Sequence, residues 1–251
     1  MTATQEPVNL PEPFGMKGKR VLITGAAGGI GSAAVRICTQ MGAEVIRLDI
    51  LDAGEMSRRD GSAAAAPAYH QCDTTDRRQV EALMARIGPV DSLIEAAGIC
   101  PFEDWTNDDW DTSFDKVIDV NLRGPINLAR AVVPGMRLRG GGQIAFCGSV
   151  AGFTGGVRGG PHYAAAKGGV HAFLRWLAQH VARDLINVNA VAPGTTDTPM
   201  TRGQGYDPSY YPQKRFAYAD EIAATLAFLC SPAAGFISGA IIDINGGTYF
   251  H

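Results

Sequence analysis

The stretch RVLITGAAGGIGSAAVRICTQMG, residues 20–42, decides how this 251-residue chain folds. Its first six residues, RVLITG at 20–25, form an apolar run of the length of a buried strand. Residues 30–42, IGSAAVRICTQMG, have the spacing of a helix that ends at Gly42. A second apolar run, EVIRLD, follows at 44–49. Strand, turn, helix and strand in this order predict a parallel βαβ unit.

The same alternation continues to the end of the chain. Further strands are predicted at 68–71, 91–98, 141–149, 186–194 and 241–247, and helices at 76–87, 108–138, 163–183 and 219–230. Apolar strands that alternate with helices form a parallel sheet covered on both faces. We therefore predict an α/β fold, a single doubly wound Rossmann domain with about seven parallel strands. It spans residues 17–251 and follows a flexible arm, residues 1–16.

Composition narrows the possible partners and compartment. The formal net charge is −3 and no Lys/Arg block occurs, so neither nucleic acid nor an anionic membrane is predicted as a partner. No apolar run is long enough to span a bilayer, and the first residues carry no signal core. Five scattered cysteines without a C-x-x-C pair predict reduced core thiols and a cytoplasmic protein. The acidic stretch at 103–111 predicts helix capping by Thr106 and Asp109, and no metal is expected.

The glycine-rich turn predicts a phosphate site. In doubly wound sheets, ligands bind beyond the carboxyl ends of the strands. Gly25, Gly28 and Gly29 let the backbone approach a pyrophosphate closely, and the helix that opens at Ile30 offers free N–H groups and a positive dipole end. A tight strand-to-helix junction is the plain alternative, but its place in a βαβ unit favours a dinucleotide.

The end of the second predicted strand favours NAD. Asp49 can accept hydrogen bonds from the adenosine ribose and repel a 2′-phosphate, although it could also be a surface carboxylate. Arg47 points the same way by strand alternation and could weaken that preference, so NADP stays open. Cys72 and Asp73 follow the third strand, where a carboxylate can accept from adenine. Asp73 as a helix N-cap is the alternative.

Tyr163 and Lys167 predict acid–base chemistry. Four positions apart on a helix, they share one face. A tyrosine hydroxyl is a poor base at neutral pH, and a neighbouring ammonium lowers its pKa. The pair alone is common on surface helices. Ser149, which ends the strand just before this helix, can hydrogen-bond a substrate oxygen and strengthens the catalytic interpretation.

Together these motifs resemble the short-chain dehydrogenase/reductase family over residues 17–248. The matching pieces are the T-G-x-x-x-G-x-G turn, Val120-Asn121-Leu122-Arg123-Gly124, Ser149, Tyr163-x-x-x-Lys167 and Pro193-Gly194. The resemblance implies that Tyr163 is the acid/base and Ser149 the substrate-oxygen donor. It further implies that Lys167 holds the ribose and lowers the Tyr163 pKa, and that Asn121 keeps a water in the proton relay. It also implies cofactor contacts at Ala96, Gly98, Pro193, Thr196 and Thr198.

Two departures from the family pattern stand out. Glu95-Ala96-Ala97-Gly98 replaces the common Asn-Asn-Ala-Gly, which leaves the partner of Glu95 unknown. Ser149 and Tyr163 are 14 positions apart, one more than expected, so the loop at 153–162 should bulge.

The predicted function is hydride transfer between NAD(H) and a small, neutral cyclic or aromatic secondary alcohol or ketone. A lid at 195–218 supplies aromatic side chains for an apolar slot, together with three rings from other loops: Tyr206, Tyr210, Tyr211, Phe216 and Tyr218 with Phe102, Trp105 and Phe153. A sugar or 3-oxoacyl reductase, or a dinucleotide-binding sensor without catalysis, are the alternatives. Helices 108–138 and 163–183 carry apolar residues beyond one face, and similar enzymes pair such helices. A homotetramer is therefore expected, or otherwise a dimer.

Overall fold

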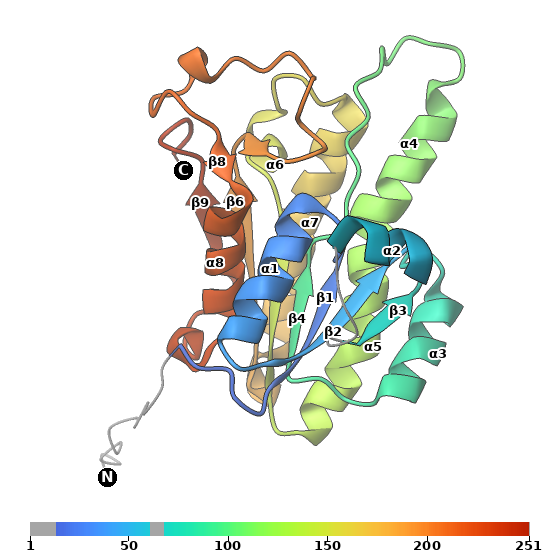
Figure 1. Ribbon diagram of the computed structural model, residues 1–251, viewed down its shortest axis with the longest axis vertical. Helices are drawn as coiled ribbons and strands as arrows, with labels where there is room; N and C mark the ends of the chain where they lie inside the picture. The colour runs from blue at the N-terminus through green and yellow to red at the C-terminus, as the bar shows by residue number, and fades with distance from the viewer. Residues whose placement is uncertain (1–13, 61–67, 251) are drawn as a thin grey trace.

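Seven parallel strands form the main sheet, as predicted, and their order in space differs from their order in the chain. They are β1 (Arg20–Thr24), β2 (Glu44–Asp49), β3 (Tyr69–Gln71), β4 (Ser92–Glu95), β5 (Gly142–Cys147), β6 (Ile186–Pro193) and β9 (Ile241–Ile244). The spatial order is β3-β2-β1-β4-β5-β6-β9 (Figure 1). From β1 the chain adds β2 and β3 on one side, and then returns to add β4 and the later strands on the other side of β1. Sheets of this kind bind ligands at the point where the strand order reverses, which here lies between β1 and β4.

The computed structural model describes residues 14–60 and 68–250, and residues 1–13 of the expected arm lie outside these ranges. Met16 is fully buried, and its N–H donates to the Met41 carbonyl oxygen at 2.8 Å. The Phe14 ring lies 6.3 Å from the Phe228 ring. Residues 14–16 therefore pack on the domain, although the sequence placed them in the arm.

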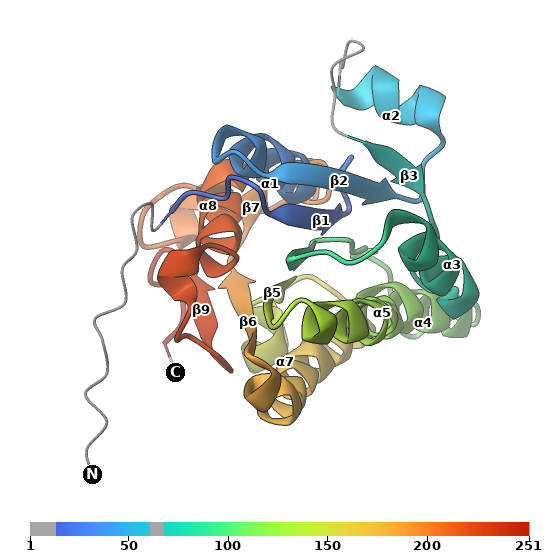
Figure 2. The same ribbon diagram turned by 90° about the horizontal axis from the view of Figure 1, so that it is seen from below.

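Alternating side chains along each strand explain why helices cover both faces. Leu22, Leu93 and Ile144 point to one face, and Ile23, Ile94 and Ala145 to the other. Helices α3 (Arg77–Ile87), α5 (Gly124–Leu138) and α7 (Pro161–Val181) cover the first face. Helices α1 (Gly29–Gln40) and α8 (Ala219–Leu229) cover the second (Figure 2). Burial on both sides accounts for the nearly continuous apolar strands.

The long helix expected at 108–138 is divided into three parts. These are α4 (Trp110–Ile118), a π-helical segment η1 (Asp119–Arg123) and α5. The expected cap by Thr106 and Asp109 is wrong. Asp104 accepts from the Thr106 N–H and hydroxyl, and Asp109, the residue before α4, makes no side-chain cap bond. A π-helical segment holds one extra residue per turn and is frequent at functional sites.

Several short elements were not predicted from the sequence. They are α2 (Ala53–Asp60), α6 (Ala151–Thr154), the parallel pair β7 (Thr196–Asp197) and β8 (Ala217–Tyr218), and the 3₁₀ turns η2 (Ala182–Asp184), η3 (Pro208–Tyr210) and η4 (Pro232–Ala234). The β7–β8 pair ties together the two ends of the lid. Helix α6 takes up part of the loop that was expected to bulge. In the described part of the chain, no helix has the length and apolar character needed to cross a membrane.

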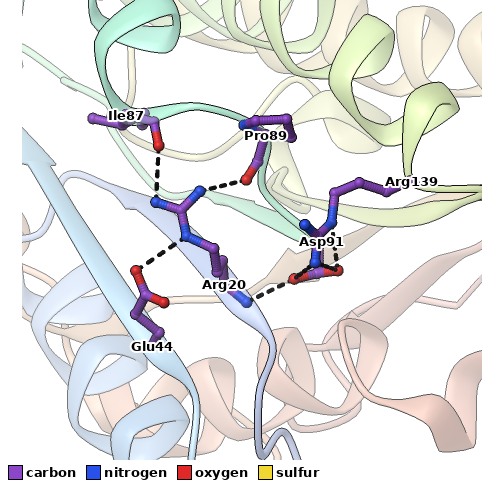
Figure 3. A network of polar contacts seen from close by, with 6 residues as sticks. All are labelled: Arg20, Glu44, Ile87, Pro89, Asp91 and Arg139. Carbon is purple, nitrogen blue, oxygen red and sulfur yellow. Dashed lines mark hydrogen bonds and ion pairs between the residues drawn. The ribbon is translucent and has the colours of Figure 1, made fainter.

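A network of charges fastens the amino ends of β1 and β4 (Figure 3). The Arg20 backbone N–H donates to Asp91 at 2.8 Å, and the Arg139 guanidinium binds both oxygens of Asp91 at 2.9 and 3.1 Å. The Arg20 side chain reaches Glu44 and the carbonyl oxygens of Ile87 and Pro89. These bonds join the connection from α3 to the first strand, at the edge opposite the predicted site.

Candidate active site

A cavity of about 470 Å³ lies at the carboxyl ends of β1, β2 and β4. It brings together the residues expected to hold the adenosine and pyrophosphate. The predicted positions that line it are Gly25, Gly28, Gly29, Ile30, Asp49, Cys72, Asp73, Ala96, Gly98 and Thr198. These residues come from five separate stretches of the chain, which meet only because parallel strands end at one edge.

The glycine-rich turn is shaped to leave this cavity open. Gly25 has φ +63°, and a Cβ there would lie 2.7 Å from the Ala96 carbonyl oxygen. A Cβ on Gly31 would lie 2.0 Å from the Gly25 oxygen. Gly28 precedes α1 without a side-chain cap, so the first N–H groups of the helix have no side-chain acceptor there. This uncapped helix end, with glycine at positions 28, 29 and 31, fits a dinucleotide pyrophosphate.

Asp49 stands at the far end of this cavity. Its carboxylate accepts from the Ala27 N–H at 2.9 Å and the Ile50 N–H at 2.8 Å, which fixes it at the end of β2. Arg47 does not line the cavity. It is buried, with its guanidinium carbon 5.8 Å from the centre of the Tyr69 ring. The expectation that Arg47 weakens the charge preference at Asp49 therefore finds no geometric support.

Asp73 lines the cavity but does not cap a helix. Its carboxylate accepts from the Thr75 N–H and hydroxyl, whereas the N-cap of α3 is Asp76, which accepts from the Arg78 and Gln79 N–H groups. The alternative reading of Asp73 as an N-cap is wrong by three residues.

A second, smaller cavity of about 100 Å³ holds the residues expected to do chemistry. Its lining includes Asn121, Ser149, Tyr163, Lys167, Pro193 and Thr196. Ile30, Ala96, Gly98 and Thr198 line both cavities, so the two are continuous. Every residue predicted for catalysis or for cofactor binding thus lines one connected hollow.

Burial dominates the electrostatics of Tyr163. Desolvation raises the pKa of its hydroxyl, the neighbouring Cys100 adds to this, and a hydrogen bond from Ser149 lowers it. The Lys167 ammonium donates instead to the Cys147 carbonyl oxygen at 2.8 Å, and it lies 5.8 Å from the centre of the Tyr163 ring. The expected lowering of the Tyr163 pKa by Lys167 is therefore not seen in the chain alone, where burial raises that pKa and Lys167 is not among the groups that shift it.

Asn121 sits in the π-helical segment and binds backbone on both sides of its amide. Its side-chain oxygen accepts from the Ile99 N–H at 3.1 Å, and its nitrogen donates to the Ile99 carbonyl at 2.8 Å. A Cβ on Gly98 would lie 2.8 Å from the Asn121 oxygen. Asn121 therefore fixes the strand end that carries Ala96 and Gly98.

The aromatic slot is smaller than expected. Phe102 and Tyr206 meet edge to face, with centroids 6.1 Å apart. Other rings proposed for the slot lie elsewhere, because they pack on neighbouring parts of the domain or face solvent. Phe153 packs on His171 and Tyr249, Tyr211 packs on Phe216, and Trp105, Tyr210 and Tyr218 are exposed.

Arg158 joins the lid to the loop before Tyr163. Its guanidinium donates to the Gln204 carbonyl oxygen at 3.1 Å, and its central carbon lies 5.7 Å from the centre of the Tyr206 ring. Its partners come from a separate loop, which the local sequence could not identify.

Cys100 is the site residue that the sequence analysis missed. A Cβ added to Gly159 would lie 3.1 Å from the Cys100 sulfur and 3.3 Å from the Tyr163 ring, so both side chains border the same glycine. The other four cysteines are buried, as predicted. The signal that could have identified Cys100 as a site residue is its position two residues after Gly98, beyond the carboxyl end of β4.

The chain matches a family model described as enoyl-(acyl carrier protein) reductase over residues 25–249. It is 35% identical to an uncharacterized short-chain type dehydrogenase/reductase of Sinorhizobium fredii, covering 94% of this chain and 99% of that protein. It is 36% identical to the 3-oxoacyl-acyl-carrier-protein reductase FabG of Thermotoga maritima, covering 92% and 98%.

Solved structures agree with the relatives in sequence. An NADP-bound Agrobacterium tumefaciens protein described as a 2-deoxy-D-gluconate 3-dehydrogenase has a TM-score of 0.84 and 30% identity, over 94% of this chain and 98% of that one. A short chain dehydrogenase/reductase family protein has a TM-score of 0.85 and 32% identity, over 93% and 98%. The chain therefore belongs to the short-chain dehydrogenase/reductase family and is an oxidoreductase acting on CH–OH and C=O groups.

Proposed function

We propose that this protein is an NAD(H)-dependent dehydrogenase/reductase in which Tyr163 is the general acid/base. The observation that carries the proposal is the continuity of the two cavities: the hollow that ends at Asp49 runs into the one that holds Ser149, Tyr163 and Lys167. A dinucleotide that fills the first would extend its reactive end into the second. A sensor without catalysis would not need Ser149 hydrogen-bonded to Tyr163.

The chain's own residues would handle the proton. When bound, the nicotinamide accepts or supplies the hydride. Ser149 would donate a hydrogen bond to the substrate oxygen, and the Tyr163 hydroxyl would give or take the proton at that oxygen. Lys167 would hold the ribose and, with its ammonium charge, stabilise the Tyr163 phenolate. Burial raises the Tyr163 pKa in the chain alone, so the hydroxyl holds the proton that ketone reduction would consume.

NAD is the proposed cofactor, and Asp49 is the reason. Its carboxylate lines the cavity where the adenosine ribose would lie, so it can accept from the ribose hydroxyls and repel a 2′-phosphate. Arg59 also lines this cavity, but its guanidinium pairs with Glu55 at 3.2 Å. The Agrobacterium tumefaciens protein has NADP bound, so a preference for NADP over NAD is the alternative that the experiment must test.

The proposed substrate is a compact, neutral, cyclic or aromatic secondary alcohol or ketone. Phe102 and Tyr206 supply two rings that meet edge to face. Burial raises the pKa of Cys100 to about 11, so this thiol stays uncharged beside Tyr163. A 3-oxoacyl thioester is the second candidate. It is favoured by the name of the Thermotoga maritima relative and by an open cavity of about 570 Å³ lined by Phe102, Lys116 and Gln204.

A substrate panel tests the proposal. Purified protein is mixed with NADH or NADPH and with cyclic ketones, an aromatic ketone, a keto sugar and a 3-oxoacyl thioester, and cofactor oxidation is followed by absorbance. We expect the highest kcat/KM with NADH and a neutral cyclic or aromatic ketone. Higher efficiency on the thioester would favour the second candidate, and no turnover of any substrate would favour the sensor.

We also propose that the chain assembles as a homotetramer. Trp176 on α7 is 54% exposed, and Phe114 on α4 and Ile126 on α5 are each 37% exposed, so these helices keep apolar side chains on their outer faces. Apolar helix faces of this kind bury themselves against symmetry-related copies. Sedimentation velocity at micromolar concentration should give a particle about four times the chain mass of 26.5 kDa, and a monomer would contradict the proposal.

A further inference from the structure

Glu95, the residue that departs from the family pattern, is a carboxyl group buried beside the proposed catalytic lysine. It ends β4 and is 1% exposed. By strand alternation it points to the same face as Leu93, toward the layer of α5 and α7. Its strand neighbour on β5 is Phe146, and the next residue there, Cys147, is the one whose carbonyl oxygen holds the Lys167 ammonium.

Thr24 fixes the orientation of this carboxyl. The Thr24 hydroxyl accepts from the N–H groups of Ala96 and Ala97, at 3.1 and 3.2 Å, and donates its single proton to the Glu95 oxygen at 3.3 Å. Because a hydroxyl has one proton to give, its direction is set by these contacts. Glu95 is thereby coupled to the turn that carries Ala96 and Gly98 of the cofactor cavity.

Few charged groups surround Glu95. The buried positions of α5 carry no ionisable side chain. From α7, the Lys167 ammonium acts on Glu95, while the buried His171 lies one turn further along, against Gly148 and Phe153. From β5, the Cys147 thiol has its pKa raised to about 11 by burial and is neutral. Among the described residues, Lys167 is the charge that acts on Glu95.

The protonation of Glu95 changes near neutral pH. Burial raises the pKa of its carboxyl to about 7, against the opposing effects of Lys167 and of the hydrogen bonds from Thr24 and Ala97. A proton on Glu95 leaves the positive charge of Lys167 uncompensated. A charged Glu95 offsets that field and disfavours a phenolate at Tyr163.

We propose that Glu95 is a positioning residue of the catalytic centre, whose gain or loss of a proton sets how strongly Lys167 stabilises the Tyr163 phenolate. It does not touch the substrate and acts through Lys167. The ionisations of Glu95 and Tyr163 are then coupled, so the rise in the rate of alcohol oxidation with pH contains contributions from both groups. This inference rests on the proposed roles of Tyr163 and Lys167.

Measuring kcat against pH for alcohol oxidation, in the wild type and in Glu95→Gln, tests the proposal. Glutamine keeps the shape and removes the charge. We expect the apparent pKa of the rising limb to fall by about one unit, the size expected for a unit charge acting across roughly 10 Å of protein. We also expect the limb to narrow to a single ionisation. A Glu95→Gln profile that superimposes on the wild-type profile would overturn the proposal.

Asp91→Asn is the matched control, because it removes a carboxylate next to the amino end of the same strand, and it should leave the pH profile unchanged.

If Glu95→Gln does not fold, infrared spectra of wild-type protein with carboxyl-labelled glutamate test the proposal instead. A protonated carboxyl band that grows as pH falls through neutral supports the proposal, and its absence overturns it. Loss of activity in Tyr163→Phe is measured separately, so that a failure of the proposed acid/base role is distinguished from a failure at Glu95.

Discussion

Charged side chains are paired differently at the two ends of the parallel strands, here called the amino edge and the carboxyl edge of the main sheet. At the amino edge, the Asp91 carboxylate accepts hydrogen bonds from the Arg20 backbone N–H and from the Arg139 guanidinium (Figure 3). The Arg139 side chain remains 40% exposed. At the carboxyl edge, Glu95 and Lys167 are 1% and 4% exposed, and burial raises the pKa of Glu95 and of Tyr163.

This difference separates stability from function within one sheet. At the amino ends of the strands, the Asp91 charge is paired with Arg139, which stays partly exposed to solvent, and these bonds hold β1, β4 and the end of α5 together. Buried ionisable groups at the carboxyl edge are destabilising by themselves, and perturbed pKa values of this kind cluster at functional sites. Substitutions at the amino edge should therefore change stability alone, and substitutions at the carboxyl edge should change catalysis.

The largest expected effect is that of Lys167→Met. It removes the ammonium but keeps the apolar stem, so folding should persist while kcat/KM falls by about a hundredfold or more, because the phenolate loses its stabilising charge. Affinity for NADH should weaken by about tenfold, since the proposed ribose contact is also lost. Steady-state kinetics and fluorescence titration with NADH measure the two effects.

Lys116→Met is the control for Lys167→Met. Lys116 also lines the cofactor cavity but lies on its exposed rim. Its replacement should change kcat/KM by less than about threefold, because an exposed charge is screened by solvent. If Lys116→Met lowered activity as much as Lys167→Met, the comparison between a buried and a rim charge would fail.

The next effect belongs to the amino edge. Asp91→Ala leaves Arg139 and the Arg20 N–H without their acceptor, which should lower the free energy of unfolding by about 2 kcal/mol. Urea denaturation measures this loss, and kcat per folded molecule should stay at the wild-type value. Glu44→Ala, which removes a partner of Arg20 whose side chain is 63% exposed, should cost less than about 0.5 kcal/mol. A large loss of kcat in Asp91→Ala would show that the two edges are not separate.

The smallest effect is expected at Asp49. Asp49→Ala should reduce the ratio of NAD to NADP efficiency by about tenfold, or ~1.4 kcal/mol, chiefly because the binding of NAD weakens. Asp73→Ala serves as the control, since Asp73 lines the same cavity but its carboxylate is engaged by Thr75. The preference for NAD should survive in that variant. A wild-type enzyme equally efficient with both cofactors would contradict the role given to Asp49.

The sheet and part of the cavity lining could be predicted because they depend on local patterns. The roles of Asn121, Thr196 and Thr198 came only from the resemblance to the family. Strand alternation, the glycine-rich turn and the Tyr163–Lys167 spacing are properties of short stretches, and the parallel sheet then brings their ends together. This is why Ser149, Asn121 and Asp49 fall on one hollow although they are distant in sequence.

The features that could not be predicted from the sequence depend on contacts with distant segments of the chain. Whether Lys167 lowers the Tyr163 pKa depends on burial and on the Cys147 carbonyl, which spacing on one helix does not reveal. Likewise, the rings of Phe153 and Tyr211 have the composition of a slot but pack on Tyr249 and Phe216 instead. Aromatic composition indicates apolar contact without naming the surface that is contacted.

Tyr163→Phe removes one hydroxyl and keeps the ring, so it isolates the proposed acid/base role of Tyr163. Turnover with the preferred ketone and NADH, and the Kd for NADH, are measured on the same preparation. We expect kcat to fall by at least about a hundredfold while the Kd for NADH stays within about threefold of wild type. A variant that keeps more than about a tenth of the wild-type kcat, a barrier change of only ~1.4 kcal/mol, would show that Tyr163 is not the acid/base.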